Sequence, residues 1–382
     1  MRILYVLDYF YPYVGGVPSL FANLTREMVR RGHEVTVITT RPSKVKNFEM
    51  HNGIKIIRLG TNRNDFLFKA SFYLRSTKKQ FDVIHTSTYS AMIPSFVTSL
   101  IRKIPAIVSV HEIWSLKEML EFYKAKGAPY FLEQKILLAL PFHKYISPSM
   151  HTNMDLRSAG VHNKKIVFIP HGIDEKIFNP SAKRFRKQIR KQIVLQEHDV
   201  TGLFIGKPTV FKGVDYLLDA VKIASKKVDV KFIFILSSLY EKERKKFMLK
   251  ILQDKVLKSK IILLRNSNDH SYVAKVIGAS DFVIMPSLSE GFGFVAAEAA
   301  SVGVPSVVTA GTSLPEVVEK NRHAIHVKPR NSFELANAII RLATDPALRK
   351  KLSKPKVFKN WKETADEYEK VYQSIAKYNE VR

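Results

Sequence analysis

The chain lacks cysteine, has few acidic residues for its length and contains no long uncharged apolar segment. Without cysteine it can form neither disulfide bonds nor metal sites with thiolate ligands, which is typical of the reducing cytoplasm or of a hot environment. Without an apolar stretch of about 18 residues we expect no membrane-spanning helix. The amino terminus lacks the charged start, apolar run and cleavage site of a signal peptide. These absences predict a cytoplasmic protein, soluble or peripheral on the inner face of a membrane.

The shortage of acids leaves a large positive charge. The 382 residues include 62 Lys and Arg against 34 Asp and Glu, a net charge of +28. Such a charge favours an anionic membrane surface or nucleic acid as a partner, and a lysine-rich thermophile surface is the third interpretation. Because no zinc-finger or RNP-like motif is present, we expect no nucleic acid and favour the membrane surface.

Motifs for metal ions and dinucleotides are also absent. There is no Asp-x-Asp pair, no His-Glu-x-x-His and no cluster of histidines, so we expect no metal ion. The Gly-x-Gly-x-x-Gly fingerprint is missing too, and we expect no cofactor. Any phosphate of a substrate must then be held by lysines and backbone N–H groups.

Apolar strands alternate with amphipathic helices from the start of the chain. The order is strand Ile3–Leu7, helix Val17–Arg31 and strand Glu34–Thr40, and this strand–helix–strand unit predicts a parallel sheet. The alternation stops at Pro170–Asp174, and the basic segment Asn179–Lys191 is interpreted as a linker followed by a surface helix.

We therefore predict an α/β protein with two Rossmann-like domains that face each other across a cleft. The first domain spans residues 1–170 and the second residues 171–357, and a last helix within 358–382 follows the second domain. Ligands of such sheets bind outside the carboxyl ends of the strands, and ligand sites favour domain interfaces. We expect the active site there.

The segment Pro286–Thr309 carries the strongest functional signal. Glu290 precedes a Gly-Phe-Gly turn, and Glu298 lies eight positions later among alanines, in a helix that ends at Gly303. Backbone N–H groups at a helix start favour an anion, and carboxylates accept hydrogen bonds from vicinal hydroxyls. These features together suit a sugar nucleotide. Because a lone acid among alanines should be buried, we expect Glu298 to have polar partners.

Two loops add groups that could hold a diphosphate. Lys207 and Lys212 lie between a strand and a helix that follows Gly213, and two cations there can neutralise a leaving diphosphate. Near the amino terminus, Gly15 and Gly16 precede a helix, where they either let a ligand approach the backbone closely or form an ordinary tight turn.

Two histidines end strands of the first domain. We expect His111 to point into the cleft, with a structural or capping role as the alternative. His85 is interpreted as structural or gating. Since neither histidine forms a nucleophile motif with Ser or Cys, catalytic-triad chemistry is not expected.

Six segments together resemble a retaining glycosyltransferase of the GT-B fold, in glycosyltransferase family 4. They follow the order of that family along nearly the whole chain. The segments are DYFYPYVGGVPSL, RRGHEVTVIT, IPHGID, FIGKPTVFKGVDYLLDA, PSLSEGFGFVAAEAASVGVPSVVT and NWKETADEYEKVY. The resemblance implies that the first domain binds the acceptor, that the second binds the donor and that the last helix crosses back to the first domain.

The resemblance also implies roles for the candidate residues. It assigns His111 and Glu290 to the transferred sugar, Lys207 and Lys212 to the diphosphate, and Glu298 to the ribose. The backbone beside the sugar and phosphates is that of Gly15, Gly16, Gly291, Phe292, Gly293 and Phe294. Two departures from the family are Lys207, which replaces an arginine with its bidentate grip, and Phe211, which replaces an acid.

The expected reaction moves a sugar from a UDP- or GDP-sugar to an acceptor hydroxyl with retention of configuration. We favour front-face attack, in which the leaving phosphate takes the acceptor's proton, over double displacement through a carboxylate nucleophile. The acceptor is expected to be lipid-linked or a polysaccharide. Residues 66–79 and 116–140 mix aromatic and basic side chains, as in helices on an anionic bilayer, although packed amphipathic helices show the same pattern.

Two other functions stay open from the sequence. One is a sugar-nucleotide epimerase or a glycan phosphorylase on the same fold, the latter with a lysine-linked pyridoxal cofactor. The other is a basic nucleic-acid-binding protein on an inactive scaffold.

Overall fold

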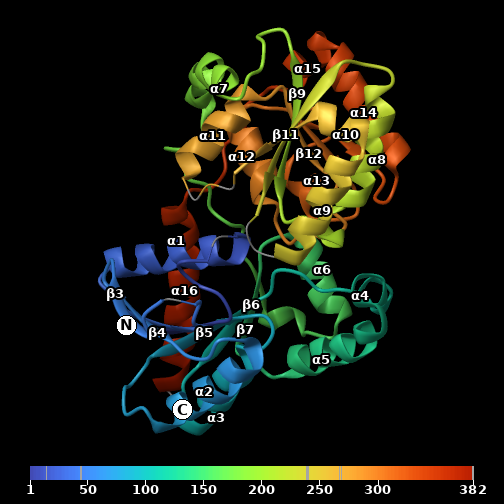
Figure 1. Ribbon diagram of the computed structural model, residues 1–382. Coiled ribbons are helices and arrows are strands. Elements are labelled where there is room, and N and C mark those ends of the chain that lie inside the picture. The colour runs from blue at the N-terminus through green and yellow to red at the C-terminus, as the bar shows by residue number, and fades with distance from the viewer. Residues whose placement is uncertain (14, 44, 238–240, 266, 268, 381–382) are drawn as a thin grey trace. The chain divides into compact units, whose positions relative to one another are not determined.

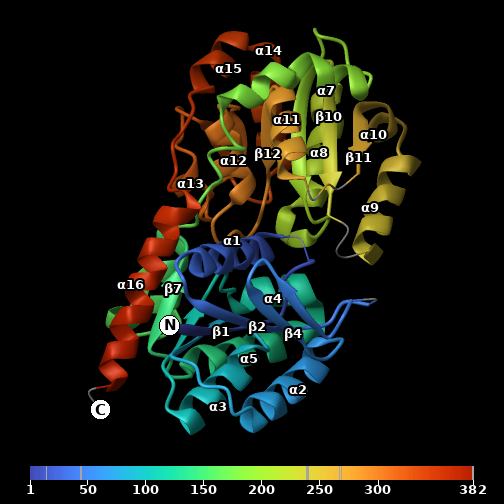
Figure 2. The same cartoon turned by 90° about the vertical axis from the view of Figure 1, so that its left-hand side faces the viewer.

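The computed structural model describes residues 1–13, 15–43, 45–237, 241–265, 267 and 269–380. The chain forms two compact units: unit 1 contains Met1–Gly172 and Lys359–Arg382, and unit 2 contains Ile173–Phe358. Each unit has a central sheet with helices packed against it (Figures 1 and 2). The predicted α/β class with two Rossmann-like units is thus confirmed. Among the described residues, no helix has the length and apolarity needed to cross a bilayer.

Unit 1 is built on an eight-stranded sheet with the order β3-β4-β2-β1-β5-β6-β7-β8. All neighbours are parallel except β3 and β4, which form an antiparallel edge. The strands are β1 (Arg2–Leu7), β2 (Glu34–Thr39), β3 (Phe48–His51), β4 (Ile54–Arg58), β5 (Val83–Ser87), β6 (Ala106–Ser109), β7 (Lys144–Ser147) and β8 (Ile166–Phe168). Tyr5 of β1 lies opposite Val37 of β2 and His85 of β5.

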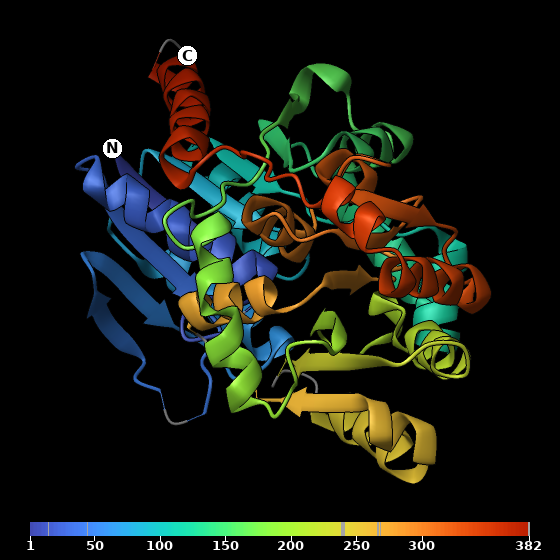
Figure 3. The same cartoon turned by 90° about the horizontal axis from the view of Figure 1, so that it is seen from above.

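The helices of unit 1 come from both the N-terminal and the C-terminal part of the chain. They are α1 (Gly16–Arg30), α2 (Arg63–Ser76), α3 (Met92–Arg102), α4 (Leu116–Tyr123), α5 (Gly127–Ala139), α6 (Met150–Ser158) and α16 (Trp361–Glu380), with the short 3₁₀ helices η1 (Lys124–Lys126) and η2 (Asn163–Lys165). The C-terminal α16 packs against α1 and β5, so the end of the chain lies beside its beginning (Figure 3).

A buried polar network holds α16 on the sheet. The Tyr372 hydroxyl lies 3.1 Å from the Tyr5 hydroxyl and 2.7 Å from Nδ1 of His85. Nε2 of His85 lies 2.8 Å from Oγ of Ser109. Burial, followed by the electrostatic interaction with the His111 ring, lowers the pKa of His85 well below its usual value. His85 therefore stays neutral and links two strands to the last helix, which is a structural role.

Unit 2 has a six-stranded, fully parallel sheet with the order β11-β10-β9-β12-β13-β14. This order is that of a dinucleotide-type doubly wound sheet. The strands are β9 (Val200–Gly206), β10 (Val230–Leu236), β11 (Ile261–Leu264), β12 (Phe282–Met285), β13 (Ser306–Thr309) and β14 (Ala324–Val327). Phe232 and Phe234 of β10 belong to one apolar core, and Ile233 and Ile235 to the other, because successive side chains of a strand point to opposite faces.

Helices cover both faces of this sheet. They are α7 (Arg186–Gln192), α8 (Val214–Ser225), α9 (Glu241–Gln253), α10 (Lys255–Lys260), α11 (His270–Ala279), α12 (Phe294–Val302), α13 (Leu314–Val317), α14 (Ser332–Thr344) and α15 (Pro346–Leu352), with η3 (Pro180–Phe185) and η4 (Val210–Lys212). The buried side chains of α8 and α14 belong to the apolar core on one face of the sheet, and those of α11 and α12 belong to the core on the other face. The sheet is therefore closed to solvent on both faces, as a parallel sheet requires.

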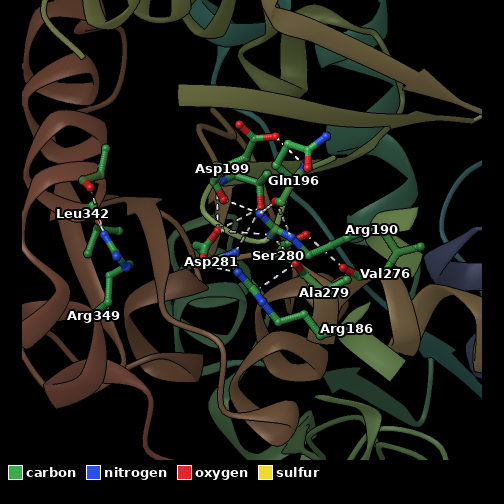
Figure 4. A network of polar contacts seen from close by, with 12 residues as sticks. Arg186, Arg190, Gln196, Asp199, Val276, Ala279, Ser280, Asp281, Leu342 and Arg349 are labelled. Carbon is green, nitrogen blue, oxygen red and sulfur yellow. Dashed lines mark hydrogen bonds and ion pairs between the residues drawn. The ribbon is translucent and has the colours of Figure 1, made fainter. Parts of the chain in front are cut away.

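The basic segment Asn179–Lys191 differs from the prediction of a linker and surface helix. It forms η3 and most of α7, and Arg190 is fully buried. The Arg190 guanidinium donates to the carbonyls of Gln196 and Ala279 at 2.8–3.1 Å and lies 3.6 Å from the Asp281 carboxylate (Figure 4). A charge can be buried only where such partners satisfy it. The segment is therefore anchored in the core of unit 2.

Candidate active site

The predicted polar residues of unit 2 lie at the carboxyl ends of two neighbouring strands. Lys207 directly follows β9, and Glu290 lies five residues after β12. β9 pairs with β12 in the sheet. Parallel strands end at the same edge, so both loops leave the sheet where its ligands bind. The Lys207 side chain is partly buried, and its carbonyl accepts the N–H of Thr209 at 2.9 Å.

Lys212 and Glu290 form an ion pair at this edge. Nζ of Lys212 lies 2.5 Å from Oε1 of Glu290, and both side chains are largely shielded from solvent. Oγ of Ser287 donates to the same carboxylate oxygen at 2.9 Å. The sequence predicted the two charged residues, but nothing in it singled out Ser287. The carboxylate is thus oriented by two donors on one oxygen.

The loop around Gly213 explains why these residues meet. Gly213 has φ 63°, and a Cβ at this position would lie 1.9 Å from the carbonyl oxygen of Pro286. The N–H of Leu288 donates to the carbonyl of Phe211 at 2.7 Å. Only glycine combines a left-handed backbone with so close an approach. The loop that carries Lys212 therefore lies directly on the loop that carries Glu290.

The Gly-Phe-Gly turn begins α12. Gly293 precedes the helix with φ 94°, and a Cβ there would lie 2.4 Å from Cδ2 of Leu314. Oγ of Ser313 donates to the carbonyl of Glu290 at 2.8 Å, which fixes the start of the turn. The N–H groups of Ala296 and Ala297 bond to the carbonyl of Gly293. The helix itself leaves the preceding N–H groups unused, as at any helix start, and these favour an anion.

The residues of this turn differ in their exposure to solvent. Gly291 and Phe292 are buried, and Phe294 is partly exposed. The rings of Phe292 and Phe294 pack edge to face with centroids 5.4 Å apart. The turn Gly291–Phe294 is thus packed into unit 2, with Phe294 as its most exposed residue.

Glu298 is the only acid of α12. Burial raises its pKa from 4.5 to about 7. Its side chain is partly exposed, and no described residue forms a hydrogen bond or an ion pair with it. The partners expected for Glu298 are therefore not provided by the described chain. A shielded carboxyl group with an elevated pKa is a frequent mark of a functional site.

His111 lies two residues after β6, at the carboxyl edge of the unit 1 sheet. Burial lowers its pKa to about 4, so the imidazole is neutral at physiological pH. Its Nε2 atom is shielded and has no hydrogen-bond partner among the described residues. The rings of Phe21 and His171 pack around it with centroids 6.3 and 5.7 Å away. A neutral imidazole with an unsatisfied nitrogen is suited to bind a hydroxyl group.

Gly15 and Gly16 lie where the sequence placed them, at the start of α1. Gly15 is the N-cap residue, and its carbonyl accepts the N–H of Ser19 at 2.9 Å. Gly16 is exposed. Among the described residues no side chain caps this helix, so its first turn can approach a ligand through the backbone.

The described residues contain no group of three His, Cys, Asp or Glu side chains that could hold a metal ion. In unit 2, cations and backbone donors lie at the carboxyl edge of the sheet together with two acids. In unit 1, a neutral histidine and a glycine loop lie at the corresponding edge. Two doubly wound units with these groups at their strand ends define a glycosyltransferase of the GT-B class.

Comparisons with known proteins identify the family. Residues 14–176 match the model of Glycosyltransferase Family 4, and residues 185–356 match that of Glycosyl transferases group 1. The chain belongs to glycosyltransferase family 4 and is a glycosyltransferase.

Relatives and solved structures cover almost the whole chain. An uncharacterized glycosyltransferase of Methanocaldococcus jannaschii is 25% identical over 94% of both chains. The structure of sucrose-phosphate synthase from Thermosynechococcus elongatus has a TM-score of 0.81 at 20% identity, over 98% of this chain and 99% of that one. Anabaena HepE, solved with UDP and glucose, has a TM-score of 0.75 at 19% identity over 99% of both chains. These structures share the fold.

Proposed function

We propose that the protein transfers a sugar, with retention of configuration, from a nucleoside diphosphate donor such as a UDP- or GDP-sugar to a hydroxyl of a lipid-linked or polysaccharide acceptor. The observation that carries the proposal is the Lys212–Glu290 pair at 2.5 Å, with Glu298 on the helix that follows. It places one cation and one acid on loops from adjacent strands, and a second acid on the helix that follows one of these loops. The fold shared with HepE, solved with UDP and glucose, is consistent with such a donor.

Unit 2 would hold the donor through complementary groups. Lys207, Lys212 and the N-terminus of α12 favour the diphosphate by charge and by the helix dipole. Glu290 would accept hydrogen bonds from the sugar hydroxyls, and Glu298 from those of the ribose. Since Glu298 lacks a partner within the described chain, two vicinal hydroxyls would satisfy a carboxylate that is otherwise costly to ionise.

Unit 1 would bind the acceptor and contribute His111 and the Gly15-Gly16 loop. The unsatisfied Nε2 of His111 is suited to a hydroxyl of the transferred sugar. Because burial keeps the imidazole neutral, it would position the sugar without adding charge. An imidazolium there would oppose the positive charge that develops on the sugar in glycosyl transfer.

In the proposed reaction, the bond between the anomeric carbon and the diphosphate oxygen breaks while the acceptor oxygen attacks from the same face. The electron pair of the broken bond goes to the diphosphate, which Lys207 and Lys212 stabilise. The acceptor proton goes to the leaving phosphate oxygen. The lysines and the backbone would supply the charge stabilisation, so we propose a reaction that requires no metal ion.

Glu290 is a poor candidate for the nucleophile of a double displacement. One of its carboxylate oxygens already accepts Lys212 and Ser287, which lowers its nucleophilicity and suits it to binding. Mass spectrometry of the enzyme, quenched during turnover, is expected to show no covalent sugar on Glu290. A glycosylated Glu290 peptide would establish double displacement.

An exposed apolar face of unit 1 supports membrane association. Phe68 and Phe72 lie one turn apart on α2 and are 73% and 76% exposed. Leu100 and Ile101 of α3, which packs against α2, are 62% and 60% exposed. The same two helices and the residues just after them also expose Lys69, Arg75, Lys78 and Lys103. We propose that this face docks on an anionic bilayer, where aromatic side chains insert and basic ones meet the headgroups.

Vesicle flotation tests the membrane proposal. The wild type should float with vesicles that contain anionic phospholipid, and a Phe68→Ser/Phe72→Ser variant should stay with the soluble fraction. Phe333→Ser is the control, because Phe333 is 62% exposed on α14 of unit 2. Equal flotation of the wild type and the Phe68/Phe72 variant would rule out this docking face.

Turnover of donor sugars tests the proposed chemistry. Thermal-shift screening with UDP-, GDP- and ADP-sugars identifies the donor, since a ligand stabilises the state that it binds. Lys212→Gln and Glu290→Gln should each lower the rate of donor turnover by about 100-fold or more. The control is Lys250→Gln, because Lys250 forms an equally short pair with Asp215 at an exposed site. Wild-type turnover in both site variants would refute the proposal.

A further inference from the structure

Arg58, the last residue of β4, is a buried cation that the site described above does not include. It is 1% exposed, and β2 separates its strand from β1 in the unit 1 sheet. A guanidinium is costly to bury unless partners satisfy it. Its Nε atom is shielded and has no hydrogen-bond partner among the described residues. The contacts of its other N–H groups therefore indicate why it is buried there.

The Arg58 guanidinium joins three segments of unit 1. Nη2 donates at 3.1 Å to the carbonyl of Tyr11, in the loop between β1 and α1. Nη1 donates to the carbonyl of Lys46 at 3.2 Å and pairs with Oε2 of Glu49 on β3 at 2.8 Å. Because a guanidinium is planar and rigid, the two acceptors on Nη1 fix the direction of Nη2. Arg58 thus holds the Tyr11 carbonyl at a defined place beside the β3–β4 hairpin.

A second contact ties Tyr11 to the same hairpin. Its ring stacks on the ring of His51, the last residue of β3, with centroids 4.4 Å apart and an angle of 12° between the planes. The Tyr11 residue is 41% exposed, so burial in the core does not fix its position. The hairpin therefore holds Tyr11 twice, by the backbone through Arg58 and by the side chain through His51.

The loop that contains Tyr11 leads directly to the glycines of the candidate site. The N–H of Tyr13 donates to the carbonyl of Phe10 at 3.0 Å, which forms a turn around Tyr11. Phe10 is buried, so the turn has one anchor in the core. Gly15, the N-cap residue of α1, follows two residues after the turn, and Gly16 begins the helix. The position of Tyr11 therefore directs the path of the backbone from β1 to the two glycines.

We propose that Arg58 is a positioning residue for sugar transfer, which with His51 fixes the loop whose glycine backbone meets the donor. The inference rests on the proposed function, in which Gly15 and Gly16 approach the donor. Because glycine permits many backbone conformations, a loop with two adjacent glycines needs a fixed flank to present one of them. A loop that is held in advance does not have to be ordered when the donor binds, and the donor binds more tightly.

The inference predicts a change in KM rather than in kcat. If only a tenth of the molecules hold the loop in the binding conformation, the apparent dissociation constant of the donor rises about tenfold. Bound donor then selects that conformation, so kcat at saturation changes little. A merely structural role for Arg58 would have a different signature, because a smaller folded fraction lowers the apparent kcat at an unchanged KM.

Steady-state turnover of UDP-glucose and GDP-mannose by the full chain measures this split. Arg58→Lys keeps the charge and removes the second amino group, and it should raise the KM for the sugar nucleotide about tenfold with kcat within about twofold. His51→Ala removes the stacked ring at a partly exposed position and should raise KM about threefold. His51→Phe, which keeps an aromatic ring, should have the wild-type KM. Arg190→Lys is the matched control, because Arg190 is a fully buried arginine of unit 2 and its loss should leave KM unchanged.

Amide hydrogen exchange reports on the loop without turnover. Exchange of the Tyr13 amide, which is bonded to Phe10, should accelerate about tenfold in Arg58→Lys and about threefold in His51→Ala. The inference is wrong if exchange and KM are both unchanged in the folded variants. It is also wrong if only one of the two changes, because the loop would then not connect Arg58 to donor binding. Should Arg58→Lys fail to fold, His51→Ala and His51→Phe decide.

Two outcomes separate this inference from the proposed function. If turnover of the sugar nucleotide depends on Lys212 and Glu290 while Arg58→Lys and His51→Ala keep the wild-type KM, only the inference fails. If the wild type turns over neither sugar nucleotide while Tyr13 exchange depends on Arg58, the loop is positioned as described and the proposed function fails.

Discussion

Glu298→Gln gives the sharpest test of the site, because the structure predicts that it stabilises the protein at neutral pH. Burial raises the pKa of Glu298 from 4.5 to about 7. At about 1.4 kcal/mol for each pKa unit, ionisation of this carboxyl group in the folded protein costs about 3 kcal/mol. Glutamine has nearly the same shape and cannot ionise, so it avoids this cost.

The sign of the pH dependence follows from proton binding. Between pH 4.5 and pH 7 the folded protein keeps the Glu298 proton and the unfolded chain loses it. The free energy of unfolding therefore falls as the pH rises through this range, and the loss is complete above pH 7. Glu298→Gln should match the wild type below pH 4.5 and be more stable by up to about 3 kcal/mol above pH 7.

Urea unfolding of both proteins at several pH values from 4.5 to 8.5 measures this difference. Glu243→Gln is the control, because Glu243 is an exposed acid on α9 of the same unit. A difference between Glu298→Gln and the wild type that stays constant with pH would refute the reasoning. The expected stabilisation should accompany weaker donor binding, because a carboxylate arranged to bind hydroxyl groups lowers the stability of the protein when no ligand is bound.

Three further substitutions test how the structure is held. Gly213→Ala should lower the free energy of unfolding by about 2–4 kcal/mol, because alanine is strained in a left-handed backbone and its Cβ would contact Pro286. The control is Gly311→Ala, which has a similar φ but open space around its Cβ, and it should cost only about 1–2 kcal/mol. Urea unfolding measures both values. Arg190→Met should cost about 3–5 kcal/mol by thermal or urea denaturation because it leaves buried acceptors unpaired, and the exposed Lys191→Met should change little; equal costs would contradict the network. Tyr372→Phe should cost about 1–3 kcal/mol and accelerate amide hydrogen exchange in α16; unchanged exchange would show that the hydroxyl does not hold the helix.

Apolar runs in the sequence were sufficient to predict the fold class. Buried parallel strands are apolar on both faces, so β1, β2, β9 and β12 were recognisable as short continuous runs. The strand β3 was missed because its four residues alternate between exposed and partly buried positions at the edge of the sheet. The prediction of a surface helix for α7 was also wrong. A basic helix usually faces solvent, and the buried partners of Arg190 lie in other segments of the chain.

Part of the candidate site could be predicted because it is continuous in sequence. Glu290, the glycine turn and Glu298 lie on one strand–loop–helix segment, and the alternation of elements placed that segment at a sheet edge. The contact of Lys212 with Glu290 depends on a loop 78 residues earlier. Only the three-dimensional packing of Gly213 on Pro286 shows that the two loops touch.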